Sequence, residues 1–131
     1  MAESATRLRR YLSDELGECR NEELQNRLSE LEDLESVLSD DIIASDVGTL
    51  SALGNETRYR LVRLLVEADG ELCVCEITPL VDVSDSAVSH ALSTLSDAGL
   101  VNKRKDGRWR KYEATRRASA LLTVLDGSRR A

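Results

Sequence analysis

The 131-residue sequence has few aromatic residues: it contains no phenylalanine, one tryptophan and three tyrosines. Its core must therefore consist mostly of Leu, Val and Ile, a composition that favours helices. A chain of this length can bury such a core without disulfide bonds. We expect one mainly α-helical domain, with or without an extension.

Long apolar runs are also absent. No stretch approaches the roughly 20 apolar residues that a membrane span needs, and no cleavable apolar leader is recognisable. Three cysteines are an odd number, and nothing marks the chain for export. We therefore expect a cytoplasmic protein with free thiols and no membrane partner.

Histidine occurs only once, as His90. With one histidine, no phosphate-binding loop and no nucleophile beside a base, the sequence offers no catalytic set. Nothing indicates an organic cofactor. The sequence predicts that the protein is not an enzyme.

Positive charge is scarce outside one segment. The net charge is −6, but residues 1–46 carry 13 acids and 5 bases, residues 47–98 carry 8 and 3, and residues 99–131 carry 3 and 10. The net charge alone argues against a nucleic-acid partner, but this uneven distribution allows one at the basic segment. The acidic composition of residues 1–98 also fits a high-salt cytoplasm, because carboxylates keep a protein surface hydrated. A halophilic source is therefore one hypothesis.

Residues 1–46 predict an acidic helical extension that carries Cys19. Leucine at every fourth position over residues 3–16 predicts a short amphipathic helix. From Asn21, the expected N-cap, leucines recur at steps of three or four residues as far as Leu38, on a helix of about five turns. Such a stripe must be covered, either by a partner subunit in a dimer or by the chain's own body.

Helices alternate with short links in the next segment. Asp46 or Thr49 is expected to cap a short helix that ends at Leu53. Asn55 begins a second helix that Gly70 ends. A third, short helix is expected to end near residue 81.

The fourth helix of this segment runs over residues 84–98. Ser84 is its expected N-cap. Val88, Leu92 and Leu95 are its expected inward residues.

The stretch LVNKRKDGRWRKYEA predicts a β-hairpin, because it alternates on both sides of Asp106-Gly107, the strongest short-range hairpin signal. Val101, Trp109 and Tyr112 are expected on its packed face. A last helix follows from about residue 116. The order of elements predicts a mainly α-helical winged helix-turn-helix over residues 47–115, with residues 116–131 as a C-terminal helix available for dimerisation.

In this fold the second helix of the pair lies in the major groove of DNA. The outward side chains of residues 84–98 are mostly hydroxyls, which can contact base edges or phosphates, and the cationic hairpin suits phosphates. Arg108 and Arg110, as alternate residues, are expected to point together. The predicted contacts to double-stranded operator DNA are Ser84, Ser86, Ser89, His90 and Ser93 on the helix and Lys103, Lys105, Arg108, Arg110 and Lys111 on the hairpin. Solvated surface is the alternative for each of them.

Two cysteines, Cys73 and Cys75, flank a single valine in ELCVCEI. In a regular helix, residues two apart lie about 200° apart around the axis, so their thiols diverge. In an extended chain they share a face, about 6.5–7 Å apart at Cα. The pair can therefore share an ion only if the backbone there is extended or distorts on binding. Buried apolar side chains, or a redox couple that involves Cys19, are the alternatives.

Four segments, LSALGNETRYRLVRLL, ELCVCEI, VSDSAVSHALSTLSDAGLV and KRKDGRWRKYEA, resemble in order the signature segments of the ArsR/SmtB metalloregulatory repressors. The resemblance covers roughly Leu50 to Ala114. Members of that family are dimeric winged-helix proteins that release operator DNA when a metal ion binds. The resemblance therefore implies a homodimeric, ligand-responsive repressor.

The resemblance also implies a ligand set. In the family the Cys-Val-Cys pair is the site of the arsenic/antimony branch and of the cadmium/lead branch. The arsenic pattern has a third cysteine where this chain has Thr78, and the cadmium/lead branch adds cysteines from the N-terminal arm, of which this chain has one. Three sulfurs, from Cys73, Cys75 and Cys19, suit pyramidal As(III) or Sb(III), whereas a tetrahedral ion needs a further ligand.

We therefore predict As(III) or Sb(III) as the inducer, with Cys19 donated by the same or the partner subunit. A Cd(II)- or Pb(II)-responsive repressor, and a redox-tuned or constitutive DNA-binding regulator without metal, are the alternatives. The family's other metal site needs histidine and carboxylates on the C-terminal helix. TRRASALLTVLDGSRRA contains no histidine and only Asp126, so sensing of Zn(II), Ni(II) or Co(II) there is not expected.

Overall fold

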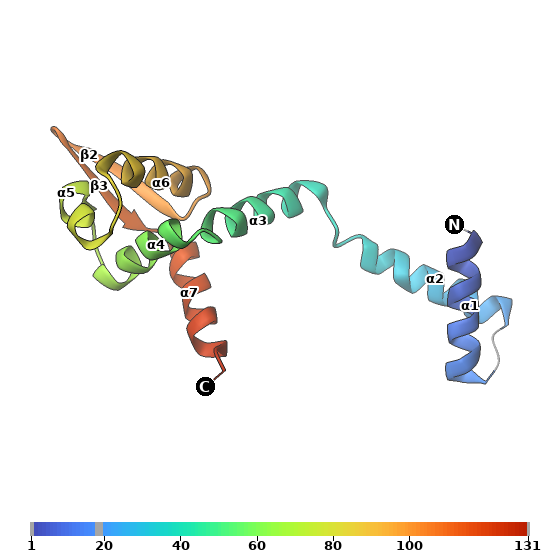
Figure 1. Cartoon of the computed structure of the whole chain (residues 1–131). Coiled ribbons are helices and arrows are strands. Elements are labelled where there is room, and N and C mark those ends of the chain that lie inside the picture. The colour runs from blue at the N-terminus through green and yellow to red at the C-terminus, as the bar shows by residue number, and fades with distance from the viewer. Residues whose placement is uncertain (1, 18–19, 131) are drawn as a thin grey trace. The chain divides into compact units, whose positions relative to one another are not determined.

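The computed structural model describes residues 2–17 and 20–130 (Figure 1). The chain divides into two compact units, Met1–Ile43 and Ala44–Ala131. Cys19 lies outside the described residues, so the structure gives no position for the third predicted sulfur ligand.

The first unit contains two helices in mutual contact, α1 (Ala2–Leu16) and α2 (Asn21–Glu35). Leu12 and Leu24 are buried. The leucine periodicity therefore predicted both helices. Exposed leucines also remain in this unit, among them Leu34.

The ends of α2 differ from the prediction. Its N-cap is Arg20 rather than Asn21, and the backbone N–H of Arg20 donates to the Glu23 carboxylate at 3.2 Å. The helix stops before Leu38 because Ser36 donates its hydroxyl proton to a carbonyl of the last turn, at 2.6 Å. Such local side-chain bonds compete with helix continuation.

Helix α3 (Asp40–Leu53) is longer than predicted, since neither Asp46 nor Thr49 begins it. Thr49 lies within the helix and is buried. Its hydroxyl lies 3.1 Å from the carbonyl oxygen of Ser45 and 3.3 Å from that of Ala98, at the end of a later helix. Thr49 therefore does not cap a helix; it joins the middle of α3 to the end of that later helix.

Helix α4 (Glu56–Ala68) begins as predicted: the side chain of Asn55 accepts from the backbone N–H of Arg58 at 3.1 Å. It ends at Ala68, and its C-cap is Asp69, one residue before the predicted stop at Gly70, with a left-handed φ of 50°. Aspartate is one of the few non-glycine residues that adopt this conformation readily.

Two short helices, α5 (Val74–Ile77) and the 3-10 helix η1 (Thr78–Leu80), lead to α6 (Asp85–Asp97). The side chain of Ser84 accepts from the backbone N–H of Ala87 at 3.1 Å, which confirms it as the N-cap of α6.

The described residues form one three-stranded antiparallel sheet with the order β1-β3-β2. The predicted hairpin consists of β2 (Val101–Asp106) and β3 (Trp109–Ala114). Strand β1 (Leu72–Cys73) pairs with β3 and was not predicted. A two-residue strand is too short to show an alternating pattern.

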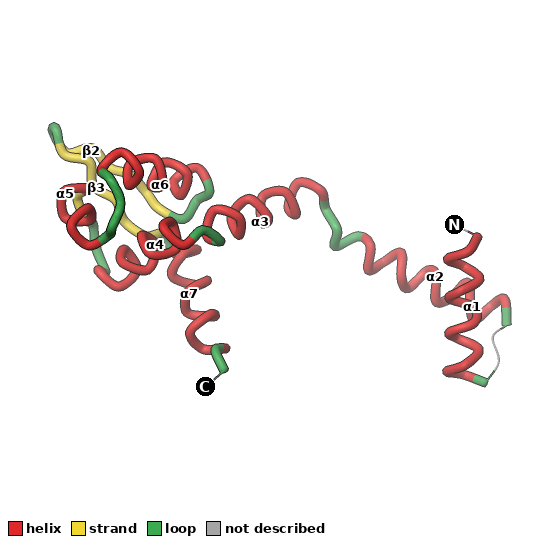
Figure 2. Tube along the Cα trace, viewed as in Figure 1, coloured by secondary structure: helices red, strands yellow, loops and turns green. Residues whose placement is uncertain are grey.

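The hairpin turn, green in Figure 2, is displaced by one residue from the predicted position. Asp106 pairs with Trp109, so the two turn residues are Gly107 and Arg108. Gly107 has a φ of 62°, as expected at the first central position of a type II′ turn.

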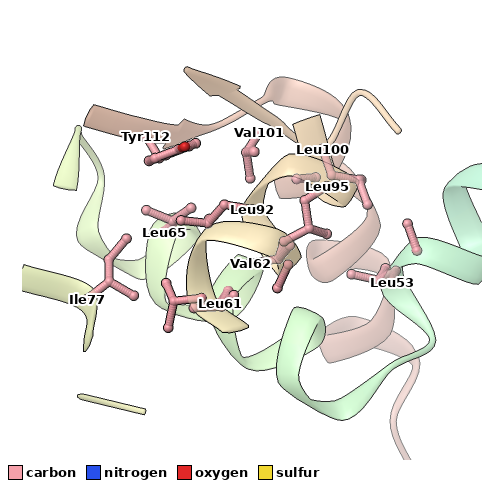
Figure 3. Packing of buried hydrophobic residues seen from close by; sticks show 14 of the residues in the cluster. Leu53, Leu61, Val62, Leu65, Ile77, Leu92, Leu95, Leu100, Val101 and Tyr112 are labelled. Atoms are coloured by element: carbon pink, nitrogen blue, oxygen red, sulfur yellow. The ribbon is translucent and has the colours of Figure 1, made fainter. Parts of the chain in front are cut away.

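The core of the second unit is aliphatic, as the composition predicted (Figure 3). Leu92 and Leu95 of α6 are fully buried, as is Val88, which confirms the predicted inner face. Leu61 and Leu65 of α4 meet this face (Figure 3). Further members of the core are Leu53, Val62, Ile77, Leu100, Val101 and Tyr112.

Trp109 does not belong to this core. Its side chain is 48% exposed, so the prediction that it packs beside Val101 and Tyr112 is wrong. The guanidinium carbon of Arg108 lies 5.1 Å from the centroid of the Trp109 ring instead. Such a cation–π contact shields one face of the ring at the hairpin tip.

The last helix, α7 (Arg116–Ser128), is attached to the core by Leu122, which is buried. Asp126 accepts two hydrogen bonds from the guanidinium of Arg63, at 2.8 and 2.9 Å, and these lower its pKa to about 2. Val124 and Leu125 are exposed. One face of α7 is therefore apolar and uncovered within the described part of the chain.

Leu92→Ala tests the core. Because Leu92 is fully buried, we expect its truncation to lower the free energy of unfolding by about 2–5 kcal/mol in a urea titration. The control is Leu80→Ala, at an exposed leucine, for which we expect a loss of about 0.5 kcal/mol or less. Equal losses in the two variants would contradict this packing.

Candidate thiol site and nucleic-acid interface

The two cysteines lie where the chain changes from strand to helix. Cys73 is the last residue of β1, with an extended backbone (φ −75°, ψ 151°), and Cys75 is in the first turn of α5. Their sulfur atoms are 2.8 Å apart, and the Cys75 thiol donates a hydrogen bond to Cys73 Sγ. The thiols converge although only one of the two residues is extended.

Local hydrogen bonds explain this convergence. Cys73 is the N-cap of α5, and its sulfur accepts from the backbone N–H of Cys75 at 3.4 Å. The carboxylate of Glu76 accepts from the backbone N–H of Cys73 at 2.9 Å, which completes a capping box. Cys73 Sγ is thereby directed toward the start of the helix, where Cys75 lies.

The pair is asymmetric in its environment. Cys73 is buried and Cys75 is exposed, and both are free thiols. The hydrogen bond to Cys73, supported by desolvation, raises the pKa of Cys75, because its protonated form is the one that makes the bond. A thiophilic ion has to displace the protons of both thiols in order to bind both sulfurs as thiolates.

One ion can contact both sulfurs. With metal–sulfur bonds of about 2.3 Å, two sulfurs on one ion can be at most about 4.6 Å apart, and the observed separation is smaller. Among the described residues, no group of three or more His, Cys, Asp or Glu side chains could hold a metal. The described residues therefore offer two sulfurs that one ion could contact.

The thiol pair opens into a hollow of about 690 Å³ that it shares with α6 and the hairpin. Thr78 and Pro79 line it beside the cysteines. The remaining lining residues are Val74 on α5, Asp85 and Ser89 on α6, and Arg108, Trp109 and Arg110 at the hairpin. A group bound to the thiols would therefore lie next to both of the elements predicted to contact DNA.

The polar residues predicted on α6 lie opposite its buried face. Ser86, His90 and Ser93 are exposed, and their spacing puts them on one stripe of the helix. Ser89 is half-buried at the edge of the hollow. Ser84 is exposed, but its hydroxyl oxygen already accepts the capping hydrogen bond.

The strand register divides the hairpin cations between two faces. Lys105 is paired with Arg110, so these two share a face with Lys103, two residues earlier. All three are exposed. Arg108 is in the turn and not on the strand, so strand alternation does not relate its direction to that of Arg110, although both line the hollow.

Two other hairpin cations on the opposite face are paired within the chain. Lys111 Nζ lies 3.3 Å from the Asp106 carboxylate, and Arg104 makes two bonds of 2.8 Å to Glu71. Lys111, which was predicted to contact DNA, is thus held in an ion pair. The bond between Arg104 and Glu71 could not be predicted, because it depends on the unpredicted strand β1.

A helix with a polar outer face beside a basic hairpin is the arrangement of a winged helix-turn-helix regulator that binds DNA. Comparisons with known proteins agree with this class. Residues 55–103 match the family described as bacterial regulatory protein, arsR family.

Over 127 residues, 97% of this chain and 98% of the relative, the sequence is 58% identical to a Halobacterium salinarum protein described as a candidate arsenical resistance operon repressor, ArsR. It is 41% identical over 61 residues to the cadmium resistance transcriptional regulatory protein CadC of Listeria innocua, covering 47% of this chain and 50% of that one. A homodimeric winged helix-turn-helix DNA-binding domain from Mycobacterium bovis, a candidate ArsR-family regulator, superposes with a TM-score of 0.58 at 25% identity, over 67% of this chain and 80% of that domain.

The chain belongs to the ArsR family of transcriptional regulators. The resemblance seen in the sequence and the predicted winged-helix fold are both confirmed. Members of this family act by binding DNA. No helix of the described residues is long and apolar enough to cross a membrane.

Arg110→Gln tests the hairpin as a phosphate contact. Loss of one phosphate contact is expected to make the dependence of log K on log salt concentration shallower by about 0.9, as measured by operator binding across a salt series. Arg27→Gln in α2, where Arg27 pairs with Glu30, is the matched control and is expected to leave the slope unchanged. Equal slopes for Arg110→Gln and the unmodified protein would contradict the assignment.

Proposed function

We propose that the chain is a homodimeric repressor that binds operator DNA and releases it when As(III) or Sb(III) binds Cys73, Cys75 and Cys19. The observation that carries this proposal is the convergence of two sulfurs, 2.8 Å apart, in a hollow bordered by α6 and the hairpin. The name of the Halobacterium relative, an arsenical resistance operon repressor, supports the same ligand class.

The donor set favours a three-coordinate ion. Thiolates select soft ions, and Cys73 and Cys75 supply two thiolates. Cys19 is the chain's remaining cysteine, and we propose that it supplies the third, from the same or the partner subunit. Three sulfurs complete the coordination shell of trivalent arsenic or antimony, because a lone pair occupies the fourth position.

Ligand binding has to alter the site. In the free protein the Cys75 thiol donates a hydrogen bond directly to Cys73 Sγ, with the sulfurs 2.8 Å apart. Two sulfurs on one pyramidal ion, with bonds of about 2.3 Å and angles of about 95°, lie about 3.4 Å apart. The pair therefore opens when the ion replaces the thiol protons and the direct hydrogen bond. Since Cys73 belongs to the sheet and Cys75 to the helix that leads to α6, opening shifts these two elements against each other.

Cd(II) or Pb(II) is the second candidate ligand. The CadC relative is described as a cadmium resistance regulator, which supports this alternative. A tetrahedral Cd(II) site would need one more ligand than the three sulfurs of this chain. A regulator that works without metal, tuned by oxidation of its thiols, is the remaining alternative.

A dimer would cover the exposed apolar side chains of the second unit. Val47 and Leu50 on α3, and Val124 and Leu125 on α7, are all exposed. Apolar side chains gathered on helices are typical of association surfaces. We propose that α7 and the leucine-bearing N-terminal extension, residues 1–46, form the dimer contacts. We also propose a cytoplasmic protein, in a cell whose high salt content suits an acidic surface.

The direct test is release of an operator fragment by arsenite. A coupling of about 3 kcal/mol would weaken operator binding about 150-fold. We expect Cys73→Ser and Cys75→Ser to bind the operator as the unmodified protein does and to lose the response. Release of the double serine variant by arsenite would contradict the proposal, and release of the unmodified protein by cadmium but not by arsenite would favour the second candidate.

The third ligand can be tested by moving it. Thr78 lines the hollow beside the thiol pair, one helical turn after Cys75. We expect Cys19→Ser to weaken the arsenite response and the added substitution Thr78→Cys to restore it, as measured by fluorescence anisotropy of the operator. A full response from Cys19→Ser alone would show that Cys19 is not a ligand.

A further inference from the structure

A side-chain bridge crosses the outer face of the three-stranded sheet. Glu71, directly before β1, accepts from Arg104 Nε and from Arg104 Nη2, both at 2.8 Å. Arg104 belongs to β2, and β3 lies between β1 and β2. The bridge therefore spans the width of two strand spacings, about 9–10 Å.

Few other contacts fasten β1 to the hairpin. Strand β1 pairs with β3 at two positions, Leu72 with Tyr112 and Cys73 with Lys111. Cys73 carries the buried sulfur of the thiol pair, two residues after Glu71. The bridge thus links the strand that holds this sulfur directly to the outermost strand of the hairpin.

The two members of the bridge are committed to each other. Both oxygens of the Glu71 carboxylate accept from the Arg104 guanidinium. The nearest other acid, Asp106, is 4.0 Å from Arg104 and lies closer to Lys111. Two hydrogen bonds between one carboxylate and one guanidinium fix the orientation of the two groups as well as pairing their charges.

We propose that Glu71 and Arg104 form a positioning pair that transmits the opening of the thiol pair to the hairpin. The inference rests on the proposed function, because it requires a ligand that separates the two sulfurs. When Cys73 moves, β1 moves with it, and the bridge carries β2 along. Without the bridge, β1 is attached to the hairpin only by its two-residue pairing with β3, and less of its shift reaches β2.

A purely stabilising role would have a different signature. The side chains of Glu71 and Arg104 are 30% and 53% exposed, and ion pairs this exposed contribute little to stability. Loss of the bridge should therefore leave folding and operator binding nearly intact. Only the difference in operator affinity with and without ligand should change.

The test compares Glu71→Gln with Asp106→Asn. Each removes one negative charge that is paired with a cation of the hairpin, but only the first cuts the link between β1 and β2. In operator titrations with and without arsenite, we expect the unmodified protein and Asp106→Asn to lose about 150-fold in affinity and Glu71→Gln to lose about 10-fold or less. Arsenite uptake, followed by mass spectrometry, should be the same for all three.

Equal arsenite responses in Glu71→Gln and the unmodified protein would overturn the proposal. So would an equal impairment of Asp106→Asn, since charge rather than the link would then be responsible. Exchanging the partners in Glu71→Arg with Arg104→Glu should restore the response. If Glu71→Gln does not fold, Arg104→Lys keeps the charge without the two parallel bonds and is expected to show the same loss.

Failure of the underlying function gives a separate result. If the unmodified protein and Asp106→Asn both keep the operator in arsenite, the proposed function itself is overturned. A response in these two that is missing from Glu71→Gln alone supports the positioning pair.

Discussion

The hydrogen bond between the two thiols depends on a change of backbone conformation within three residues. Cys73 ends a strand and caps a helix, and Cys75 lies in that helix. In a regular helix the two side chains would diverge, and in a regular strand they would lie about 6.5–7 Å apart at Cα. The junction brings the sulfurs to 2.8 Å, where the Cys75 thiol donates a hydrogen bond to Cys73 Sγ and one ion could bind both sulfurs in place of their two protons.

The same junction connects the thiols to both parts of the DNA-binding unit. On one side, β1 pairs with β3 of the hairpin. On the other side, α5 and η1 lead within a few residues to Ser84 and the start of α6. In the proposed mechanism, a change at the sulfurs would therefore act on the boundary between the hairpin and α6, without having to cross the core.

The sequence predicted well those features that depend on periodicity and local capping. Val88, Leu92 and Leu95 were identified as the inner face of α6, and Asn55 and Ser84 as caps, because these follow from neighbours within one helical turn. The aliphatic core followed from the scarcity of aromatic residues, and the hairpin and the helices followed from local patterns. Their determinants are close together in the chain.

Features that depend on distant contacts were missed. Strand β1 has two residues and exists because β3 pairs with it, so no local pattern marks it. Thr49 was mistaken for a cap because its bond to Ala98 spans 49 residues. The sequence does not show which acid pairs with Lys111 or with Arg104. The strand register is needed to show that Lys111 pairs with Asp106 and Arg104 with Glu71. For the cysteines, the sequence indicated only a condition, an extended or distorted backbone, and the strand-to-helix junction that brings the sulfurs together was not predicted.

The central claim is that one thiophilic atom binds the sulfurs of Cys73 and Cys75 together. The arsenic X-ray absorption spectrum of the arsenite-treated protein tests it most directly. The account predicts that arsenic is surrounded by sulfur atoms, three in the unmodified protein and fewer when either cysteine of the pair is replaced by serine. Arsenic surrounded by oxygen alone, or a sulfur shell that survives both replacements, would contradict it.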